Sequence, residues 1–261
     1  MVNSSTKFFF DDRWSDNTSL PSGYQALPSI KNVTLDSGLY SFNVIGEKTI
    51  IEDQIQGRDE PYLYNVDFKP LEFTINIAFE NYETIDEVTK VITWLYNPNT
   101  YKRLKFENMD TNFFAIFIGS PEYYYVGRNN ISYKEYIGYI TCKVRTNAPY
   151  GYTDVLTNTT NSGDLDVYPS FSIANTAGAE NEVTLSHGSN GSSFTYLMSS
   201  GETLEFNGYT KVLKSTNVSP AKNPYPAWDK DYLILNPGTN TVSVTGNGQT
   251  VTYSYRAPKY L

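Results

Sequence analysis

Histidine, the side chain that most often serves as a general base, occurs once in this chain, at His187. It lies in the polar segment 186–193, SHGSNGSS, between two expected strands. A catalytic triad would need a nucleophile and an orienting carboxylate around it, and no G-x-S-x-G motif occurs nearby. We therefore expect His187 to be an exposed loop histidine, and the sequence predicts no catalytic residue.

The single cysteine, Cys142, lies in the alternating segment 139–144, YITCKV. Alternation points it the same way as Ile140 and Val144. A lone cysteine forms neither an internal disulfide nor a C-x-x-C site. Because free cysteine behaves mostly as a small hydrophobe, we expect a buried structural thiol.

Motifs for metals and cofactors are missing. Zinc needs several Cys or His ligands, whereas this chain has one of each, far apart. Asp164 and Asp166 could offer oxygen ligands to calcium, but the rest of an EF-hand loop is absent, so we interpret them as solvated carboxylates. No P-loop occurs, and no G-x-G-x-x-G follows a predicted strand. The sequence predicts no metal site and no cofactor.

Acidic side chains are numerous enough to supply the paired carboxylates of a glycoside hydrolase. The available ones are Glu52, Asp53, Asp59, Glu60, Asp164, Asp166 and Glu202. Nothing in their spacing singles out two of them. Enzymatic activity is therefore unsupported, and a glycan-degrading enzyme is kept only as an open alternative.

Aromatic residues make up 15% of the chain, with 23 Tyr and 14 Phe. Core packing accounts for most of such a surplus, although Tyr and Trp are also favoured at protein interfaces. Flat aromatic rings also stack on sugars, and Trp228, after the segment 223–227, NPYPA, is the candidate for such stacking. A noncatalytic carbohydrate- or receptor-binding protein is thus a second open alternative.

The charge balance disfavours nucleic acid as a specific partner. The 261 residues include 20 Lys and Arg against 28 Asp and Glu, a formal net charge of −8, whereas phosphate binding needs clustered cations. No run of 18 apolar residues occurs, and the mean hydropathy is −0.43, so we expect no membrane insertion. The segment 8–12, FFFDD, is unlike the apolar region of a signal peptide, and we expect synthesis in a cytoplasm.

The spacing of apolar residues changes along the first half, from the period of a strand to that of a helix. Residues 71–80 alternate as a half-buried strand does, and apolar residues then recur at three- and four-residue steps over 85–95. The second pattern predicts a helix over 85–96, with a capping box at Thr84 and Glu87 and an end at Asn97-Pro98. Further strands are expected at 31–34, 41–45, 49–55, 101–106, 113–118, 123–125 and 136–145. This order predicts an α+β domain, in which one helix covers antiparallel sheet.

The second half shows almost no helical periodicity. A polar, turn-rich stretch at 147–164 predicts a boundary between domains 1–152 and 153–261. Short strands are expected at 167–173, 182–186, 194–198, 203–206, 210–213, 232–235, 242–244 and 251–255. Eight short strands with regular turns favour a β-sandwich, and the fold class of the whole chain is mainly β.

The ordered motifs of the first half resemble one family. The segment 58–73, RDEPYLYNVDFKPLEF, resembles the signature region of distal tail proteins, called Dit, of long-tailed siphophages that infect Gram-positive bacteria. The strand at 71–80, the helix at 85–96 and the segment 104–107, LKFE, follow in that family's order.

The second half is similar to the galectin-like β-sandwich of the same family. The segments 163–169, GDLDVYP, 201–204, GETL, and 236–244, NPGTNTVSV, are similar to its entrance, its middle turn and its closing strand. The resemblance therefore covers nearly the whole chain. The chain is short for the family and has no long insertion in this half, so we expect no additional carbohydrate-binding module.

The resemblance implies a structural protein of the virion tail tip, or baseplate. N-terminal domains of distal tail proteins build a homo-hexameric ring, a hub that joins the major tail tube protein to the tail-associated tip protein. In some phages receptor-binding proteins attach to its outer arms. Genome DNA would pass through the ring without specific binding, for which a negative charge is suitable.

The segment 46–70 carries more apolar side chains than a solvated loop needs. We predict that part of it packs on the neighbouring subunit of the ring, with Tyr and Phe as anchors. The alternative, that all these side chains pack inside their own domain, is open. The predicted interface residues are Ile50, Ile51, Ile55, Arg58, Tyr62, Tyr64 and Phe68.

Overall fold

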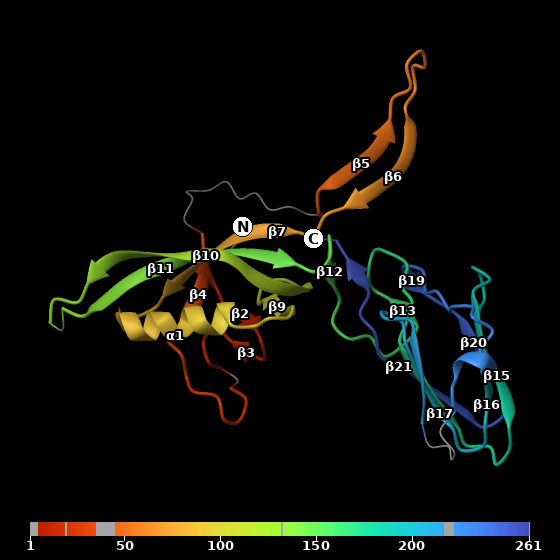
Figure 1. Cartoon of the computed structure of the whole chain (residues 1–261). Coiled ribbons are helices and arrows are strands. Elements are labelled where there is room, and N and C mark those ends of the chain that lie inside the picture. The colour runs from red at the N-terminus through yellow and green to blue at the C-terminus, as the bar shows by residue number, and fades with distance from the viewer. Residues whose placement is uncertain (1–4, 19, 35–44, 132, 217–221, 261) are drawn as a thin grey trace. The chain divides into compact units, whose positions relative to one another are not determined.

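The computed structural model describes residues 5–18, 20–34, 45–131, 133–216 and 222–260 (Figure 1). The chain divides into two compact units, the first ending at Gly151 and the second covering Tyr152–Tyr260. Each unit has its own hydrophobic core. The predicted fold class is confirmed, because the chain is mainly β, with an α+β unit followed by a β-sandwich.

The sheet of the first unit curls round on itself. Its strands pair in the order β1-β4-β7-β11-β10-β9-β2-β3, and only Lys7 separates β1 from β2. The segment 5–10 therefore pairs with β4 at one end of the sheet and with β9 at the other, which closes a barrel. The strands are β1 (Ser5–Thr6), β2 (Phe8–Phe10), β3 (Arg13–Trp14), β4 (Ile30–Val33), β7 (Glu72–Phe79), β8 (Glu83–Thr84), β9 (Lys102–Phe106), β10 (Asn112–Arg128) and β11 (Glu135–Thr146).

Helix α1 (Ile85–Tyr96) packs its apolar face on this barrel, as its period predicted. Thr84 begins it with the predicted capping box: the Glu87 amide donates to Thr84 Oγ1 at 3.3 Å, and the Thr84 amide donates to Glu87 Oε2 at 2.8 Å. The helix buries Val88, Val91 and Leu95. Among the described residues, no helix combines the length and the apolar character that crossing a membrane requires.

Strand β10 corrects one expectation. The sequence predicted two strands, 113–118 and 123–125, separated by the segment Gly119-Ser120-Pro121, but β10 runs on through that segment. Its register against β11 shifts between Ile118 and Glu122, and Gly119 takes a positive φ of 70°. A bulge therefore absorbs the residues that break a regular ladder. Of the strand expected at 41–45, residues 41–44 lie outside the described residues.

The second unit is a sandwich of two antiparallel sheets, ordered β18-β17-β14-β21 and β16-β15-β20. Buried and less buried residues alternate along β14 and β16, so the inward side chains of both sheets form one core. The elements are β12 (Gly151–Tyr152), β13 (Thr160–Asn161), β14 (Phe171–Asn175), β15 (Asn181–His187), β16 (Ser193–Met198), β17 (Thr203–Asn207), β18 (Val212–Thr216), the 3₁₀ turn η1 (Tyr225–Ala227), β19 (Gly238–Thr239), β20 (Val242–Thr245), β21 (Gln249–Tyr253) and β22 (Pro258–Lys259).

Three strand predictions in this unit were displaced or wrong. The strand expected from 167 begins at Phe171, after Pro169, which has no amide hydrogen to donate to a ladder. The strand expected from 210 begins at Val212, because Lys211 has a positive φ of 59° in the preceding turn. Residues 232–235 form no strand, and Leu235 makes only an isolated bridge with Val167.

Replacing Thr84 by Ala removes the side-chain half of the capping box and leaves a helix amide without its acceptor. We expect the first unit to lose about 1 kcal/mol of unfolding free energy, measured by urea denaturation. Thr89→Ala is the matched control, since Thr89 lies inside the same helix and its hydroxyl only donates to the Ile85 carbonyl. Equal losses in both variants would contradict a capping role.

Candidate assembly surface

The segment 46–70 forms a two-stranded antiparallel ribbon, made of β5 (Lys48–Asp53) and β6 (Tyr62–Phe68) (Figure 1). Within the described part of the chain, neither strand pairs with a third. At the base, the Gly46 amide donates to the Pro149 carbonyl at 2.8 Å. The other end turns at Gly57, whose φ of +88° suits glycine.

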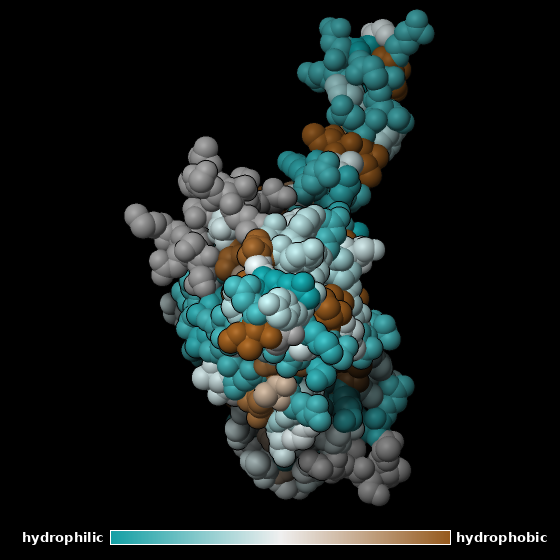
Figure 2. Space-filling view, turned by 90° about the vertical axis from the view of Figure 1, so that its left-hand side faces the viewer, coloured by the Kyte–Doolittle hydropathy of each residue, from teal (hydrophilic) through white to brown (hydrophobic). Residues whose placement is uncertain are grey.

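The apolar side chains of the ribbon are exposed. Relative exposures run from 43% for Phe68 to 65% for Tyr64, and Ile50, Ile51, Ile55, Tyr62 and Leu63 lie between them. Two strands without a covering layer have no interior in which to bury such side chains. The alternative that they pack inside their own domain is therefore wrong. Figure 2 shows hydrophobic patches on the ribbon surface.

The register gathers several of these side chains on one face. Ile50 lies opposite Val66, and Val66 and Phe68 share a face because alternate residues of a strand point the same way. Tyr64 lies where the register shifts between Ile51 and Glu52, at a bulge. Nearer the turn, the Arg58 guanidinium lies 4.1 Å from the centre of the Tyr62 ring. All seven residues that the sequence predicted for an interface lie on the ribbon.

A hollow of about 360 Å³ lies where the ribbon leaves the barrel. Its lining residues are Gly46, Glu47, Lys69, Pro70, Leu71, Glu72 and Arg145. The charges around it pair with one another: Lys69 with Glu47 at 2.9 Å, and Arg145 with Glu72 at 3.1 Å. These pairs brace the base of the ribbon and leave the hollow without a net charge to attract an ion.

A second exposed apolar group lies at the far end of β10 and β11, and the sequence reasoning assigned it no role. This β10–β11 tip, residues 124–134, exposes Tyr124, Tyr125, Val126, Ile131 and Tyr133, with Ile131 at 92%. The sequence held one signal of it: three apolar residues stand in the turn-like segment 126–134, VGRNNISYK, where polar residues are usual.

Trp228 is not a platform for sugars. Its ring is only 8% exposed and packs among aromatic rings of the sandwich core, 5.1 Å from Tyr232 and 5.9 Å from Phe194. The indole N–H donates to the Asp231 carbonyl at 3.0 Å. A sugar could not reach either face without opening the core, so the prediction of stacking at Trp228 was wrong.

His187 is buried rather than exposed, which corrects a second expectation. The amides of Ser189 and Asn190 both donate to Nδ1 at 3.2 Å, so Nε2 carries the hydrogen and donates to Asn240 Oδ1 at 2.7 Å. Both ring nitrogens are used in holding a loop.

Cys142 is fully buried as predicted, and burial raises the pKa of its thiol to about 11, which makes it a poor nucleophile.

Most of the candidate carboxylates are exposed on the surface. Glu52, Asp53, Asp59 and Glu60 are exposed on the ribbon, and Asp164 and Asp166 are exposed in the second unit. In the described part of the chain, no group of three or more acidic, His or Cys side chains is placed to hold a metal ion. These six carboxylates therefore lie on exposed surface.

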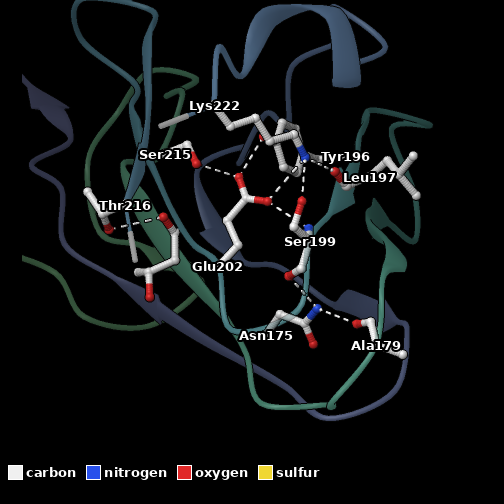
Figure 3. A network of polar contacts seen from close by, with 10 residues as sticks. Asn175, Ala179, Tyr196, Leu197, Ser199, Glu202, Ser215, Thr216 and Lys222 are labelled. Atoms are coloured by element: carbon white, nitrogen blue, oxygen red, sulfur yellow. Dashed lines mark hydrogen bonds and ion pairs between the residues drawn. The ribbon is translucent and has the colours of Figure 1, made fainter. Parts of the chain in front are cut away.

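Glu202 is fully buried in the sandwich and accepts four hydrogen bonds (Figure 3). Tyr196 Oη and Ser215 Oγ donate to Oε1 at 2.7 and 2.6 Å, and the Ser199 amide and Lys222 Nζ donate to Oε2 at 2.7 and 3.1 Å. Burial by itself raises the pKa of Glu202, but the hydrogen bonds from Ser215, Ser199, Tyr196 and Lys222 together outweigh it and hold the pKa below its ordinary value. This carboxylate is a structural anion with all its partners inside the protein.

Comparison with known proteins identifies the family. A family model described as a phage tail protein N-terminal domain matches residues 3–148, more than half of the chain. The chain belongs to this phage tail protein family. The match covers the barrel, the helix, the ribbon and the β10–β11 tip, and so includes both exposed apolar surfaces.

One relative of this tail protein is the SPbeta prophage-derived uncharacterized protein YomH of Bacillus subtilis strain 168, 34% identical over 92 residues. The match spans 35% of this chain and only 36% of the relative.

Solved structures show the fold over both units. The crystal structure of the Dit protein (gp 19.1) of phage SPP1 matches with a TM-score of 0.63 at 12% identity, over 96% of this chain and 98% of that one. A chain of the phage P2 baseplate, in its activated conformation with Ca, matches with a TM-score of 0.50 at 8% identity, over 98% of each chain. The fold is thus that of a distal tail protein, as the sequence resemblance implied.

Glu202→Gln tests the role of the buried carboxylate. Removing its charge leaves Lys222 without its counterion, and we expect the second unit to lose about 2–4 kcal/mol at pH 7. Because the pKa of Glu202 is lowered in the folded state, its stabilisation is complete above about pH 4.5 and is lost as pH falls through the folded pKa.

Thermal unfolding of wild type and variant at pH 7, 5 and 3 measures this difference. The gap between their melting temperatures should narrow at pH 3. Glu205→Gln is the control, because Glu205 is exposed and lies 3.9 Å from Lys214. A gap that widens on acidification would refute this account.

Proposed function

We propose that this phage tail protein is the distal tail hub of a siphophage, a homo-hexameric ring at the end of the tail tube. The observation that carries the proposal is the fold match with SPP1 Dit over nearly the full length of both chains, a protein described as a hub of the adsorption apparatus in phages infecting Gram-positive bacteria. The family match supports a place in the phage tail independently.

The exposed ribbon supports a role in assembly. A cyclic ring uses heterologous interfaces, in which one surface of a subunit meets a different surface of the next. The ribbon supplies such a surface, with large apolar side chains that its own unit does not cover. We therefore assign Ile50, Ile51, Ile55, Arg58, Tyr62, Tyr64 and Phe68 to the contact between subunits.

The same proposal gives the other partners. The N-terminal domain, predicted at residues 1–152, would build the ring between the major tail tube protein and the tail-associated tip protein. The C-terminal domain, predicted at residues 153–261, would be the outer domain, to which a receptor-binding protein can attach. Genome DNA would pass through the ring without specific binding, which the net charge of −8 favours.

We propose a structural and non-enzymatic role, since neither His187 nor Cys142 is available for chemistry. Because Trp228 is buried, the residue that was the candidate for direct sugar binding cannot serve in that role.

The native mass of the purified chain tests the ring. Light scattering over a range of concentrations should show a particle of about 177 kDa, six times 29.5 kDa, and negative-stain images should show a central hole. A chain that stays monomeric at every concentration would count against a self-assembling ring.

The variant Tyr62→Ser with Tyr64→Ser tests the ribbon in the same assay. Buried aromatic anchors are each worth about 2 kcal/mol at interfaces, so we expect the variant to be folded and monomeric where the wild type forms rings. The control variant, Tyr24→Ser with Tyr101→Ser, changes two exposed tyrosines outside the ribbon. Rings that form equally well in the ribbon variant and in the control variant would contradict the assignment of the ribbon to the interface.

A further inference from the structure

The ribbon end that carries the turn is acidic. Residues 52–60 contain Glu52, Asp53, Asp59 and Glu60 against Arg58 alone, a formal charge of −3. All of these residues are exposed. The surface that receives this end must therefore tolerate or complement a concentration of negative charge next to Ile55 and Tyr62.

The β10–β11 tip has the opposite sign and a similar apolar character. Residues 124–134 contain Arg128 and Lys134 and no acidic residue, a formal charge of +2, while Glu122 and Glu135 flank this stretch and accept from Tyr124 and Asn129. The Arg128 guanidinium lies over the Tyr133 ring at 5.2 Å, and its Nε donates to the Tyr133 carbonyl at 2.6 Å. The cation is therefore held at the surface beside Ile131 and Tyr133, both well exposed.

The tip is also where the first unit concentrates its remaining exposed apolar surface. Among the described residues outside the ribbon, this unit exposes nine large apolar side chains. Five are in the tip itself, and two more, Tyr82 and Ile85, flank the short strand β8, which pairs with β11 beside the tip. The face turned to the viewer in Figure 2, which includes the tip, shows several hydrophobic patches among hydrophilic ones.

The tip and the base of the ribbon lie at opposite ends of one strand. Strand β11 starts at Glu135 beside the tip and ends at Thr146, which bonds to Leu71 at the ribbon base. Its 12 residues, at about 3.3 Å each, separate these ends by about 35–40 Å. Both surfaces are exposed in the same subunit, so neither covers the other within one chain.

We infer that the acidic end of the ribbon of one subunit docks on the β10–β11 tip of the next subunit. This inference rests on the proposed ring and names the surface that the ribbon contacts. The occupant of the tip is a second copy of this chain, because opposite charges and apolar groups complement one another and the two surfaces are unlike, as a closed head-to-tail ring requires.

Charge reversal tests the contact. The first variant is Arg128→Glu with Lys134→Glu, and the second is Asp59→Lys with Glu60→Lys. Each places like charges across the interface, so each variant should need at least about tenfold higher concentration to form rings at low salt. Lys90→Glu with Lys214→Glu is the control for the first variant, since it makes the same change in net charge outside both surfaces.

Mixing the two variants gives the decisive measurement. The reversed tip of the first variant then meets the reversed ribbon of the second, and the natural tip of the second meets the natural ribbon of the first. An equimolar mixture should therefore form rings of alternating subunits at the concentration at which the wild type forms them. The chain that carries all four substitutions should also recover. Native mass spectrometry distinguishes such mixed rings from rings of one variant.

Two other results would overturn the inference. Rings that form normally in each separate variant would show that the ribbon docks elsewhere, on the tail tube protein, on the tail-associated tip protein or on another part of the subunit. The hub proposal would stand in that case. Loss of rings in each variant without recovery in the mixture would mean that the reversed residues do not face one another. A wild-type chain that forms no ring would instead remove the ring and this contact together.

Discussion

The pairing of β11 with its two neighbours is the interaction on which the first unit depends. On one side β11 pairs with β7 from Tyr139 to Arg145, and on the other it pairs with β10 along most of its length. Its inward residues Ile140, Cys142 and Val144 are fully buried. At its end, Thr146 accepts from the Leu71 amide and donates to the Ala148 carbonyl, which fixes the point where the ribbon joins the barrel. One buried strand therefore positions both exposed surfaces.

Sequence reasoning succeeded where a period in the sequence reflects burial on one face. The helix at 85–96, the strand at 71–80 and the buried Cys142 all follow from such periods, since each pattern spans enough residues to separate inside from outside. The apolar character of the segment 46–70 was found for the related reason that its apolar content exceeds what a loop needs, but the second strand of the ribbon, β6, was not predicted. The continuity of β10 was missed because a bulge keeps a strand paired through Gly119 and Pro121, which local rules treat as a break.

The errors at Trp228 and His187 have a different cause. Both residues stand in segments rich in Pro, Gly, Ser and Asn, and such segments usually lie on the surface. Here tertiary contacts decide: Trp228 fills the sandwich core between Phe194 and Tyr232, and Asn240, 53 positions along the chain, accepts from His187. Partners so distant leave no local trace in a single sequence. The same holds for Glu202, whose burial depends on Ser215 and Lys222.

The ribbon also bears on how the free subunit avoids aggregation. Within the described residues its two strands have open edges, with backbone amides and carbonyls that another extended chain can pair with. The strands also carry isoleucines and tyrosines of the kind found in amyloid-forming segments. Glu52, Asp53, Asp59 and Glu60 place like charges where two ribbons would stack edge to edge. We expect these carboxylates to act as gatekeepers, because they repel an identical ribbon and so disfavour stacking between free subunits.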